Sequence, residues 1–400
     1  MKAVVLAAGE GSRMRPLSYT RPKVMIPLAN KPILEHLLVE AKKGGITEFI
    51  LIVGYHDEQI RNFFGDGGRW DIKIEYSTQR RQQGTADALR TVKDLLDGPF
   101  LMLNGDNIIN ARHFKAIADT DITAMSLLEV ENTEGLGLVE IKADRVVAIH
   151  EKADEPVSNL ANAGLYYFTP EIFTAISETP LSPRGEYEIT DSIELLINKG
   201  QAVTYQVIDS WLEASYPWDL LTSNEILLEE ISGENRGELE ENSVIKGAVE
   251  IGFGTVVRSG SYIIGPVVIG DNCTIGPNCF IRPSTSIGDN CHIGSSVEVK
   301  NSIIMKNSVI PHHNYVGDSI IGEGCNLGAG TKIANLRLDY QNIIVADKDT
   351  GRKKMGAILG DEVKTGINAS LNLGTMIGNN TLIGPGAVAS GIISPNSKIY

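Results

Sequence analysis

The sequence predicts an α/β domain with a mainly parallel sheet, followed by a parallel β-helix. Three observations lead to this fold class. The chain has 400 residues, more than one ordinary hydrophobic core accommodates. Its front half alternates short apolar runs with segments of helical periodicity. In its back half, aliphatic residues recur every six positions, a spacing that neither a helix nor an isolated strand produces.

The front half is expected to form a parallel sheet covered by helices. A helix is predicted from Ile33 to Lys43, because its apolar side chains share one face and two glycines follow as a stop signal. The order strand–helix–strand favours a parallel sheet, whose ligands bind at the carboxyl ends of strands. The segment LAAGEGSRM, residues 6–14, lies at such an end. Strands are predicted at residues 3–6, 49–53, 100–103, 123–130 and 165–168.

A change of pattern marks the boundary between the two halves. Residues 219–241 have the pattern of a helix followed by a polar, charged joint. We therefore expect one domain at residues 1–225, a helix and linker at 226–243, and the β-helix at 244–400.

The six-residue repeat predicts the β-helix. Each short strand of such a fold turns one aliphatic side chain inward, and Gly, Asn and Asp fill the turns because they tolerate left-handed backbone. Three phases of inward side chains are predicted. The first is Ile251, Val257, Ile263, Ile269, Ile275, Ile281, Ile287, Ile293 and Val299. The second is Ile303, Val309, Tyr315, Ile321, Leu327 and Ile333, and the third is Leu371, Ile377 and Ile383.

Composition and charge limit the classes of partner. With 42% hydrophobic residues and a net charge of −14, the chain is not expected to bind nucleic acids or anionic membranes, which need basic surfaces. It has no apolar run of about 20 residues, and MKAVVLAAGEGS is interpreted as a first strand rather than a secretory signal. We expect a cytoplasmic protein. Its cysteines lack a C-x-x-C pair and are expected to be small buried side chains: Cys273, Cys279, Cys291 and Cys325.

The glycine-containing loop after the first strand suits phosphate binding. Gly9 and Gly11 leave room for backbone N–H groups to surround phosphate oxygens, and Arg13 and Lys23 add positive charge. The loop is neither a Walker loop, since no Gly-Lys-Ser/Thr follows, nor the dinucleotide motif G-x-G-x-x-G. Taken alone, it is weak evidence for a phosphate site.

Five motifs in the front half occur in a fixed order: LAAGEGSRMRPLSYTRPKVMIPLANKPI, QRRQQGTADAL, MLNGD, HEK and NAGLYYF. Together they resemble the sugar-1-phosphate nucleotidylyltransferases over residues 1–225, which implies a Rossmann-like domain. The resemblance places Arg13 on the triphosphate of an NTP and Lys23 at the reacting phosphates. It places the base and phosphates on Leu6, Ala8, Gly9, Gly11, Gln79, Gly84 and Thr85. It places the sugar phosphate on Gly137, Glu151, Lys152 and Asn162.

The same resemblance implies a Mg²⁺ ion held by Asp106. The family's second ligand comes from a W-x-D-V-G-x-P-W-D-L-L segment, and this chain has WLEASYPWDLL at residues 211–221. Glu213 therefore stands where aspartate is usual and is expected to be the second ligand. Asp219 is expected to be structural. Because the reaction joins two anions, positioning and cations supply most of the catalysis, and no covalent nucleophile is required.

The repeat resembles the left-handed β-helix of the hexapeptide acyltransferases, which implies a homotrimer. Within it, FIRP, VEVK and PHHNYVGDSIIGEGCNLGAGTKIANLR resemble the glucosamine-1-phosphate acetyltransferase domain of the bifunctional enzymes that make UDP-N-acetylglucosamine. The resemblance implies that His312 is the general base, a role that suits a side chain able to accept a proton near neutral pH. Arg282 and Lys300 would bind the sugar phosphate. Tyr315, Asn326 and Asn335 would surround the glucosamine.

Two segments depart from that acetyltransferase pattern. Asn335 is followed by Leu-Arg-Leu where Tyr-Asp-Gly is usual, and Gly366-Ile367 stands where Gly-Ser is expected. The sequence GRKKM at residues 351–355 leaves two interpretations open, a contact with the phosphates of coenzyme A or a solvated basic loop.

The sequence therefore predicts a bifunctional enzyme acting on small molecules. Glucosamine-1-phosphate would be acetylated by acetyl-CoA. UMP or dTMP would then be transferred from UTP or dTTP to N-acetylglucosamine-1-phosphate or glucose-1-phosphate. Transfer of UMP to N-acetylglucosamine-1-phosphate would give UDP-N-acetylglucosamine. Two alternatives stay open. One is a monofunctional glucose-1-phosphate thymidylyltransferase or uridylyltransferase with a β-helix that only assembles chains. The other is a non-catalytic regulatory subunit that binds a sugar nucleotide.

Overall fold

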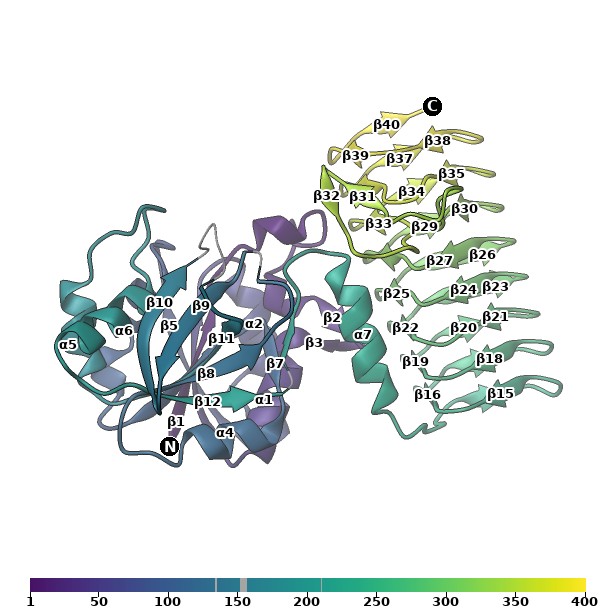
Figure 1. Ribbon diagram of the computed structural model, residues 1–400. Helices are drawn as coiled ribbons and strands as arrows, with labels where there is room; N and C mark the ends of the chain where they lie inside the picture. Colours follow the sequence, from purple (N-terminus) through teal and green to yellow (C-terminus); the bar gives the residue numbers. More distant parts are fainter. Residues whose placement is uncertain (134, 152–156, 210) are drawn as a thin grey trace. The chain divides into compact units, whose positions relative to one another are not determined.

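The computed structural model describes residues 1–133, 135–151, 157–209 and 211–400 (Figure 1). Its chain divides into two units. The sheet unit contains Met1–Glu10, Pro22–Met25 and Ile33–Glu213, and the coil unit contains Gly11–Arg21, Ile26–Pro32 and Ala214–Tyr400. The segment LAAGEGSRM is thus divided after Glu10, and two short stretches of the front sequence belong to the coil unit.

The sheet unit is built on a nine-stranded sheet with a parallel centre, in the order β10-β9-β11-β6-β1-β4-β5. Strands β6, β1, β4 and β5 are parallel, and β11 adds an antiparallel neighbour to β6. Off this path, β8 pairs with β11 and β12 pairs with β8. The bounds are β1 Lys2–Ala7, β4 Glu48–Val53, β5 Lys73–Thr78, β6 Phe100–Asn104, β8 Ala124–Glu129, β9 Gly137–Lys142, β10 Arg145–Glu151, β11 Leu160–Phe168 and β12 Thr204–Ile208.

Helices cover both faces of this sheet. The helices are α1 Ile33–Lys43, α2 Asp57–Phe64, α3 Thr85–Arg90, α4 Ala111–Ile117, α5 Ile172–Glu178 and α6 Ile189–Asn198. In β1, Ala3 and Val5 pack into one core with α1, α2 and α4, whereas Val4 packs into the other core with α3, α5 and α6. Burial of both faces explains why the strands read as continuous apolar runs. The predicted parallel α/β architecture is confirmed.

Short elements complete the front of the sequence. In the sheet unit, β7 Asn107–Ile109 pairs antiparallel with β13 Trp211–Glu213, and the turns η2 Lys23–Met25, η3 Gly68–Trp70 and η4 Lys93–Leu95 are 3₁₀ helices. In the coil unit, η1 Ser12–Met14 is a 3₁₀ helix, β2 Pro27–Leu28 pairs with β3 Lys31–Pro32, and α7 spans Asp219–Glu229.

The coil unit consists of three parallel sheets whose strands alternate along the chain, which is the architecture of a β-helix. The first sheet contains β14 Glu238–Leu239, β17 Val256–Val257, β20 Thr274–Ile275, β23 His292–Ser295, β26 Val309–His312, β29 Asn326–Leu327, β34 Lys364–Thr365, β37 Leu382–Ile383 and β40 Lys398–Ile399. The second contains β15 Val244–Lys246, β18 Tyr262–Ile264, β21 Phe280–Ile281, β24 Glu298–Lys300, β27 Tyr315–Gly317, β30 Lys332–Ile333, β35 Ser370–Leu371 and β38 Val388–Ala389.

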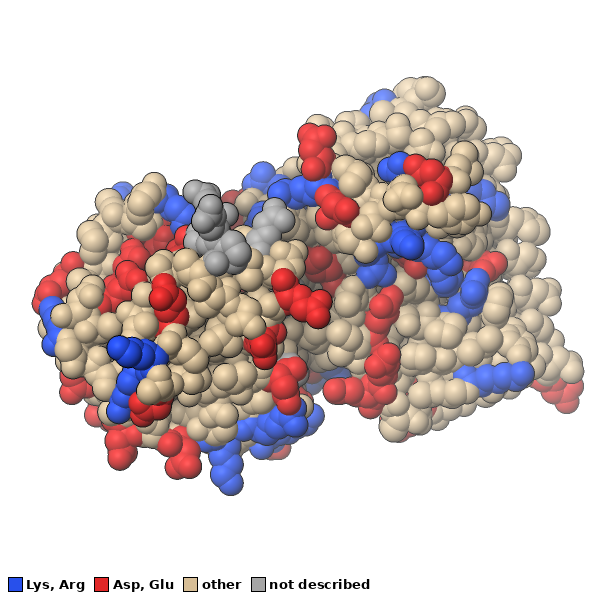
Figure 2. Space-filling model, in the orientation of Figure 1, with Lys and Arg blue, Asp and Glu red and all other residues tan. Residues whose placement is uncertain are grey.

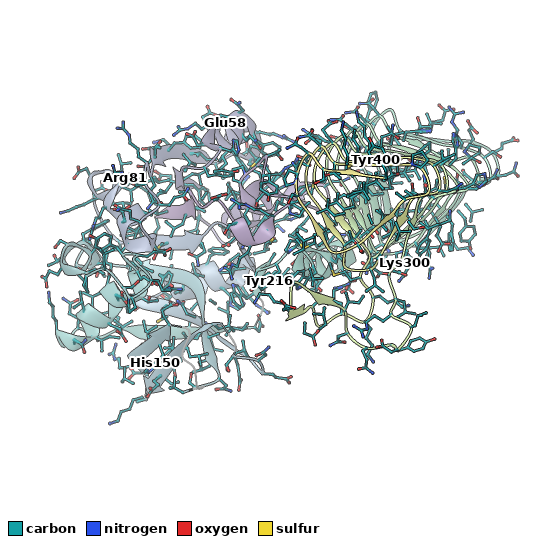
Figure 3. All side chains as sticks on the ribbon, turned by 90° about the horizontal axis from the view of Figure 1, so that it is seen from above. Glu58, Arg81, His150, Tyr216, Lys300 and Tyr400 are labelled. Atoms are coloured by element: carbon teal, nitrogen blue, oxygen red, sulfur yellow. The ribbon has the colours of Figure 1, made fainter. Side chains whose placement is uncertain are left out.

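The third sheet completes each turn of the coil, and Figure 3, which looks along the stack, shows the turns superimposed. Its strands are β16 Val249–Ile251, β19 Val267–Ile269, β22 Thr285–Ile287, β25 Ile303–Ile304, β28 Ile320–Ile321, β33 Ile358–Leu359, β36 Met376–Ile377 and β39 Ile392–Ile393. Left-handed backbone occurs at Asn272, Asn278 and Asn290, in the turns that the sequence assigned to such residues. A hairpin of β31 Ile344–Val345 and β32 Lys348–Asp349 interrupts the repeat.

The interior of the coil confirms the first and third phases of the repeat and the later part of the second, Ile321, Leu327 and Ile333, and it corrects the earlier part of the second. The predicted residues from Ile251 to Val299 and from Leu371 to Ile383 lie in one buried apolar core. In the second phase, however, the residues inside are Ile304, Ile310 and Val316, and not the preceding Ile303, Val309 and Tyr315. The spacing shortens to five residues after Val299 and again after Val316, so every inward position between them moves by one.

Two further expectations concern the buried thiols and the membrane. All four cysteines are free and buried in the coil unit, as predicted. Among the described residues, none of the helices combines the length and apolar character needed to cross a bilayer.

On the face that Figure 2 shows, acidic and basic side chains are intermixed over both units.

The coil core predicts a clear difference between buried and exposed isoleucines. Ile281→Ala should destabilise the protein by about 2–5 kcal/mol, because it leaves a cavity among fully packed neighbours. Ile392→Ala should change stability by no more than about 0.5 kcal/mol, because the side chain is 64% exposed. Urea unfolding followed by circular dichroism measures both. Equal shifts would contradict the inward placement of Ile281.

The thiols are expected to be unreactive in the native protein. Burial raises the pKa of Cys279 to about 11 and that of Cys325 to about 12, so the reactive thiolate is scarce at pH 8. A hydrogen bond with Cys291 lowers the pKa of Cys273, but this thiol is buried like the other three. We therefore expect Ellman's reagent to label all four thiols after denaturation and almost none before it. Rapid labelling of the native protein would show that the coil core opens to solvent.

Candidate active sites

The first candidate site lies in the sheet unit, where β1 and β6 end side by side. The Lys23 Nζ donates a hydrogen bond to the Asp106 Oδ2, so the structure brings these two predicted residues together. The Lys23 side chain is 10% exposed and that of Asp106 is 28% exposed. Between β6 and Asp106, the Gly105 N–H donates to the Leu6 carbonyl at 2.9 Å. A Cβ at Gly105 would lie 2.6 Å from that oxygen, so glycine permits the close approach.

The backbone of Glu213 lies beside this pair. In the antiparallel pairing of β13 with β7, Glu213 is opposite Asn107, the residue after Asp106. The Asn107 side chain is 2% exposed, and within the described parts of the chain its Oδ1 has no hydrogen-bond partner. Oxygen donors from these residues match the chemistry that Mg²⁺ prefers. The described residues contain no group of three or more His, Cys, Asp and Glu side chains able to hold a metal by themselves, and Mg²⁺ sites commonly use one or two carboxylates plus substrate phosphates.

The residues expected to read the base also lie together. The Gln79 Nε2 donates to the Gly84 carbonyl at 3.1 Å and to the Asp87 carboxylate at 2.9 Å. Gly84 has φ +108°, and a Cβ there would lie 2.4 Å from the Tyr187 carbonyl, so no other residue fits this turn. Thr85 continues the turn into α3 and accepts the backbone N–H of Ile189 on its Oγ1 at 2.9 Å.

The loop after β1 connects with this group. The Ala8 carbonyl accepts hydrogen bonds from the Gln82 side chain at 2.6 Å and from the Tyr55 N–H at 3.1 Å. A Cβ added at Gly9 would have nothing within 4 Å, so this part of the loop is open. The structure thus joins Ala8 with the QRRQQGTADAL segment, as the ordered motifs predicted.

The residues expected to hold the sugar phosphate fall into two places. Gly137 of β9 and Glu151 of β10 are opposite each other in an antiparallel pair. The Arg184 Nη2 lies 3.4 Å from the Glu151 carboxylate. The Asn162 Nδ2 donates to the Tyr166 hydroxyl at 2.6 Å, one strand away in β11. Lys152 lies outside the described residues.

Gly11 and Arg13 belong to the coil unit. Gly11 has φ +66° at the start of η1, and its carbonyl accepts the Ser18 hydroxyl at 2.8 Å. The Arg13 guanidinium lies 5.8 Å from the centre of the Tyr216 ring, labelled in Figure 3. The Lys348 ammonium of β32 lies 5.2 Å from the same centre. Two cations therefore share one aromatic ring, which stabilises their positions.

Asp219 has the structural role expected of it. Its carboxylate accepts the backbone N–H groups of Ser215 at 2.9 Å and Tyr216 at 2.7 Å. These bonds tie the turn after β13 to the first residue of α7, so the turn that carries Tyr216 is fixed by the helix.

The second candidate site lies on the outer face of the β24–β27–β30 sheet in the coil unit. The Lys300 ammonium, labelled in Figure 3, pairs with the Asp318 carboxylate at 3.1 Å, and Asp318 is 2% exposed. The Asn335 Nδ2 donates to the Tyr315 hydroxyl at 3.1 Å and also to Asp318. The site thus contains three of the predicted residues around one buried carboxylate.

Arg282 lies one turn before Lys300 on the same face. Its guanidinium pairs with the Glu298 carboxylate of β24 at 3.0 Å. Burial raises the pKa of the Tyr315 hydroxyl, which therefore stays protonated and can donate a hydrogen bond near neutral pH.

His312 occupies the corner before that face. It ends β26, exposed, three residues before Tyr315, and its carbonyl accepts the Gly330 N–H at 2.9 Å. Burial first, and the neighbouring charge of His312 second, lower the pKa of His292. Asn326 is exposed at the start of β29, opposite Val309 of the same sheet.

The basic segment GRKKM, residues 351–355, is solvated only in part. Arg352 is not a solvated side chain, because its Nη1 donates to the Thr222 hydroxyl at 2.6 Å and its Nη2 to Glu225 at 3.2 Å, both on α7. Lys353 and Lys354 are exposed. Ile343 and Met355, which lie before and after the β31–β32 hairpin, are both buried, so this segment is a packed part of the coil unit.

Comparison with known proteins now identifies the family. Residues 2–230 match the nucleotidyl transferase family, and residues 263–399 match the GMPPB C-terminal domain. The "Bifunctional protein GlmU" of Methanocaldococcus jannaschii is 41% identical over 404 residues, which cover 100% of this chain and 97% of the relative. The chain belongs to the nucleotidyl transferase family, in its bifunctional branch.

Other relatives of this bifunctional nucleotidyl transferase give the same result. The "Bifunctional protein GlmU" of Methanococcus maripaludis strain S2 is 40% identical, over 100% of this chain and 97% of the relative. The "Bifunctional sugar-1-phosphate nucleotidylyltransferase/acetyltransferase" of Sulfurisphaera tokodaii is 36% identical, over 98% and 97%. The bifunctional prediction therefore holds over both alternatives, a monofunctional transferase and a non-catalytic subunit.

A solved structure supports the fold of the front part of this nucleotidyl transferase. A protein from Bacillus anthracis assigned as a glucose-1-phosphate thymidylyltransferase superposes with a TM-score of 0.53 at 28% identity, covering 59% of this chain and 98% of that one. A UDP-glucose pyrophosphorylase structure shares the fold at 20% identity and the same TM-score.

Sequence reasoning missed residues that the structure places within hydrogen-bond or ring contact of the predicted ones. Arg184 pairs with Glu151, and Tyr216 and Lys348 accompany Arg13. The repeat did not mark Asp318, because the turn after Lys300 is one residue short and pairs Lys300 with Gly317. The other contacts join segments without a shared repeat, so the sequence carries no local signal for them.

Asp318 is expected to orient the second site. Asp318→Ala should lower the rate of acetyl transfer by up to about 100-fold, because Lys300 and Asn335 lose the carboxylate that holds them in place. Glu241→Ala, which removes an exposed carboxylate on an earlier turn of the coil, is the matched control. Both activities of each variant are assayed separately. A loss of nucleotidyl transfer equal to the loss of acetyl transfer would mean general misfolding.

Proposed function

We propose that the two units carry out successive steps in the synthesis of an activated amino sugar. The coil unit would transfer the acetyl group of acetyl-CoA to glucosamine-1-phosphate. The front domain would then transfer UMP or dTMP from UTP or dTTP to N-acetylglucosamine-1-phosphate, or to glucose-1-phosphate, with release of pyrophosphate. One observation carries the proposal: Lys23 contacts Asp106 in the sheet unit, and Lys300 and Asn335 both contact Asp318 in the coil unit.

For nucleotidyl transfer, the phosphate oxygen of the sugar attacks the α-phosphorus of the NTP. A new P–O bond forms as the bond to the β-phosphate oxygen breaks, and pyrophosphate leaves. Lys23 is held at the site by Asp106 and offsets charge on the reacting phosphates, and Arg13 offsets charge on the triphosphate. Gln79, Gly84 and Thr85 orient the base, with Leu6, Ala8, Gly9 and Gly11 along the nucleotide.

The sugar phosphate and a metal ion would bind near these groups. Asp106 and Glu213 would hold Mg²⁺, which when bound offsets phosphate charge. The proposed sugar-phosphate residues are Gly137, Glu151, Asn162 and Lys152, the last outside the described residues. Arg184 adds a cation beside Glu151. These groups act by holding two mutually repelling anions at contact distance.

For acetyl transfer, the amine nitrogen of glucosamine-1-phosphate attacks the thioester carbonyl carbon. His312 accepts the proton that the amine loses as the C–N bond forms, and it passes this proton to the coenzyme A thiolate as the C–S bond breaks. Tyr315, Asn326 and Asn335 would contact the sugar. Arg282 and Lys300 would bind its phosphate, which must share these cations with Glu298 and Asp318.

We also propose a homotrimeric, cytoplasmic protein, with the domains at residues 1–225 and 244–400 joined by 226–243. Exposed apolar side chains on the coil unit support association: Phe253 is 71% and Val388 62% exposed.

Two variants test the separation of activities. His312→Ala should abolish acetyl transfer and leave nucleotidyl transfer unchanged, because the imidazole lies in the coil unit and accepts the amine proton. Asp106→Ala should do the opposite, because it removes the partner of Lys23 and a metal ligand. Acetyl-CoA consumption and pyrophosphate release are measured separately for each variant.

The wild-type enzyme supplies the control and the substrate assignment. Glucosamine-1-phosphate and acetyl-CoA are supplied with UTP, dTTP, ATP or GTP in turn, and we expect turnover with UTP or dTTP. Loss of both activities in either variant, at unchanged thermal stability, would contradict the two-site proposal.

A further inference from the structure

Arg21 is a buried cation in the coil unit, although it lies close to the nucleotide motifs in the sequence. The residue is 8% exposed. Its Nη2 donates to the Asp361 carboxylate and, at 3.3 Å, to the Glu323 carboxylate, while its Nη1 lies 3.4 Å from the Met305 sulfur. A guanidinium is rarely buried unless it is paired, so these contacts define a specific location for the residue.

The acceptor site for Arg21 is built from three stacked turns of the coil. Met305 follows β25, Glu323 follows β28 and Asp361 follows β33, and these three strands are consecutive in one sheet. The Asp361 Oδ1 accepts the Glu323 N–H at 2.8 Å, and its Oδ2 accepts the Thr20 hydroxyl together with Arg21. Asp361 is 8% exposed, so the pair is screened little by water.

A second stretch of the front sequence is also fixed to the coil unit. The Ala29 N–H donates to the Asn224 Oδ1 at 2.8 Å, and the Asn30 Nδ2 donates to the Ile287 carbonyl at 2.6 Å. Asn224 in turn donates to the Ser284 carbonyl at 3.2 Å. Two stretches of the front sequence are therefore held by contacts within the coil unit.

The chain on the other side of Arg21 leads back to Arg13. Met14, Leu17 and Ser18 are buried in this stretch, and Ser18 closes it by donating to the Gly11 carbonyl. Residues 11–21 thus form a packed loop whose last residue is its ionic anchor. Arg13 lies in this loop, and both Arg13 and its anchor belong to the coil unit.

We propose that Arg21 and Asp361 are a positioning pair for nucleotidyl transfer, which holds the loop that carries Arg13 in one conformation. The inference rests on the proposed function of Arg13. Neither Arg21 nor Asp361 touches substrate. They keep the loop in one conformation before the phosphates bind. Little further conformational entropy of the loop is therefore lost when Arg13 meets the triphosphate.

Asp361→Asn in the full-length protein is the central test, because it removes the charge and keeps the shape. We expect kcat for pyrophosphate release to fall about 10- to 100-fold, the cost of displacing catalytic groups by up to an ångström. Acetyl transfer should stay within twofold, because His312 and Asp318 are not displaced. Arg21→Lys should give an intermediate kcat, since it keeps a charge for Asp361. Glu362→Gln, the adjacent exposed carboxylate, is the matched control and should change neither activity.

Hydrogen–deuterium exchange tests the same idea without substrates. In Asp361→Asn, the amides of residues 11–21 should exchange faster, while those of α2 and of β20–β21 should not change. If the wild type released no pyrophosphate with any NTP, the proposed function would fail, and faster exchange confined to residues 11–21 would still support the anchor.

Three results would overturn the inference. Unchanged exchange at residues 11–21 would show that Asp361 does not hold the loop. Faster exchange with an unchanged kcat would show that the held conformation is irrelevant to catalysis. An equal fall of both activities, with faster exchange throughout the coil, would mean that the pair only stabilises the fold.

Discussion

The coil unit depends on one constraint: an aliphatic side chain must point inward at every step of the repeat. Ile263 pairs with Ile281, and Ile281 with Val299, so residues eighteen apart stack on successive turns. A slip of one position would turn the apolar side chains outward and expose the core. The same constraint aligns the outer face. Arg282 and Lys300 are eighteen residues apart, one full turn, whereas the next turn is one residue shorter, so that Lys300 is paired with Gly317 and Asp318 follows at the next position.

Most of this unit could be predicted from spacing, and the errors occur where the spacing changes. After Val299 the chain reads KNSII, and either isoleucine of the pair satisfies an aliphatic pattern. The turn is one residue shorter there, which selects Ile304 over Ile303 and moves Tyr315 to the outside. Periodicity does not detect such a deletion, because it becomes visible only when the strands are paired. The outward position of Tyr315 is also what allows its hydroxyl to meet Asn335.

The front of the chain was predictable in a different way. Alternating cores on the two faces of β1 and β4 follow from continuous apolar runs, and the ordered motifs placed Lys23 next to Asp106. The motifs did not reveal that residues 11–21 and 26–32 pack with the coil. The partners of Arg21 lie about 300 residues away, and neither Glu323 nor Asp361 differs in sequence context from other acidic residues in turns of the repeat. Long-range ion pairs leave no local pattern.

The long separation between Arg21 and Asp361 also has a consequence for biosynthesis. Arg21 emerges from the ribosome 340 residues before its carboxylate partner. At a synthesis rate of about 5–20 residues per second, that delay lasts roughly 20 to 70 seconds. The strands of the central sheet after β1, up to β12 at Ile208, are made during this interval, while residues 11–21 still lack Glu323 and Asp361. The nascent chain must therefore keep a cationic, partly apolar segment in water until the turn that carries Asp361 has been made.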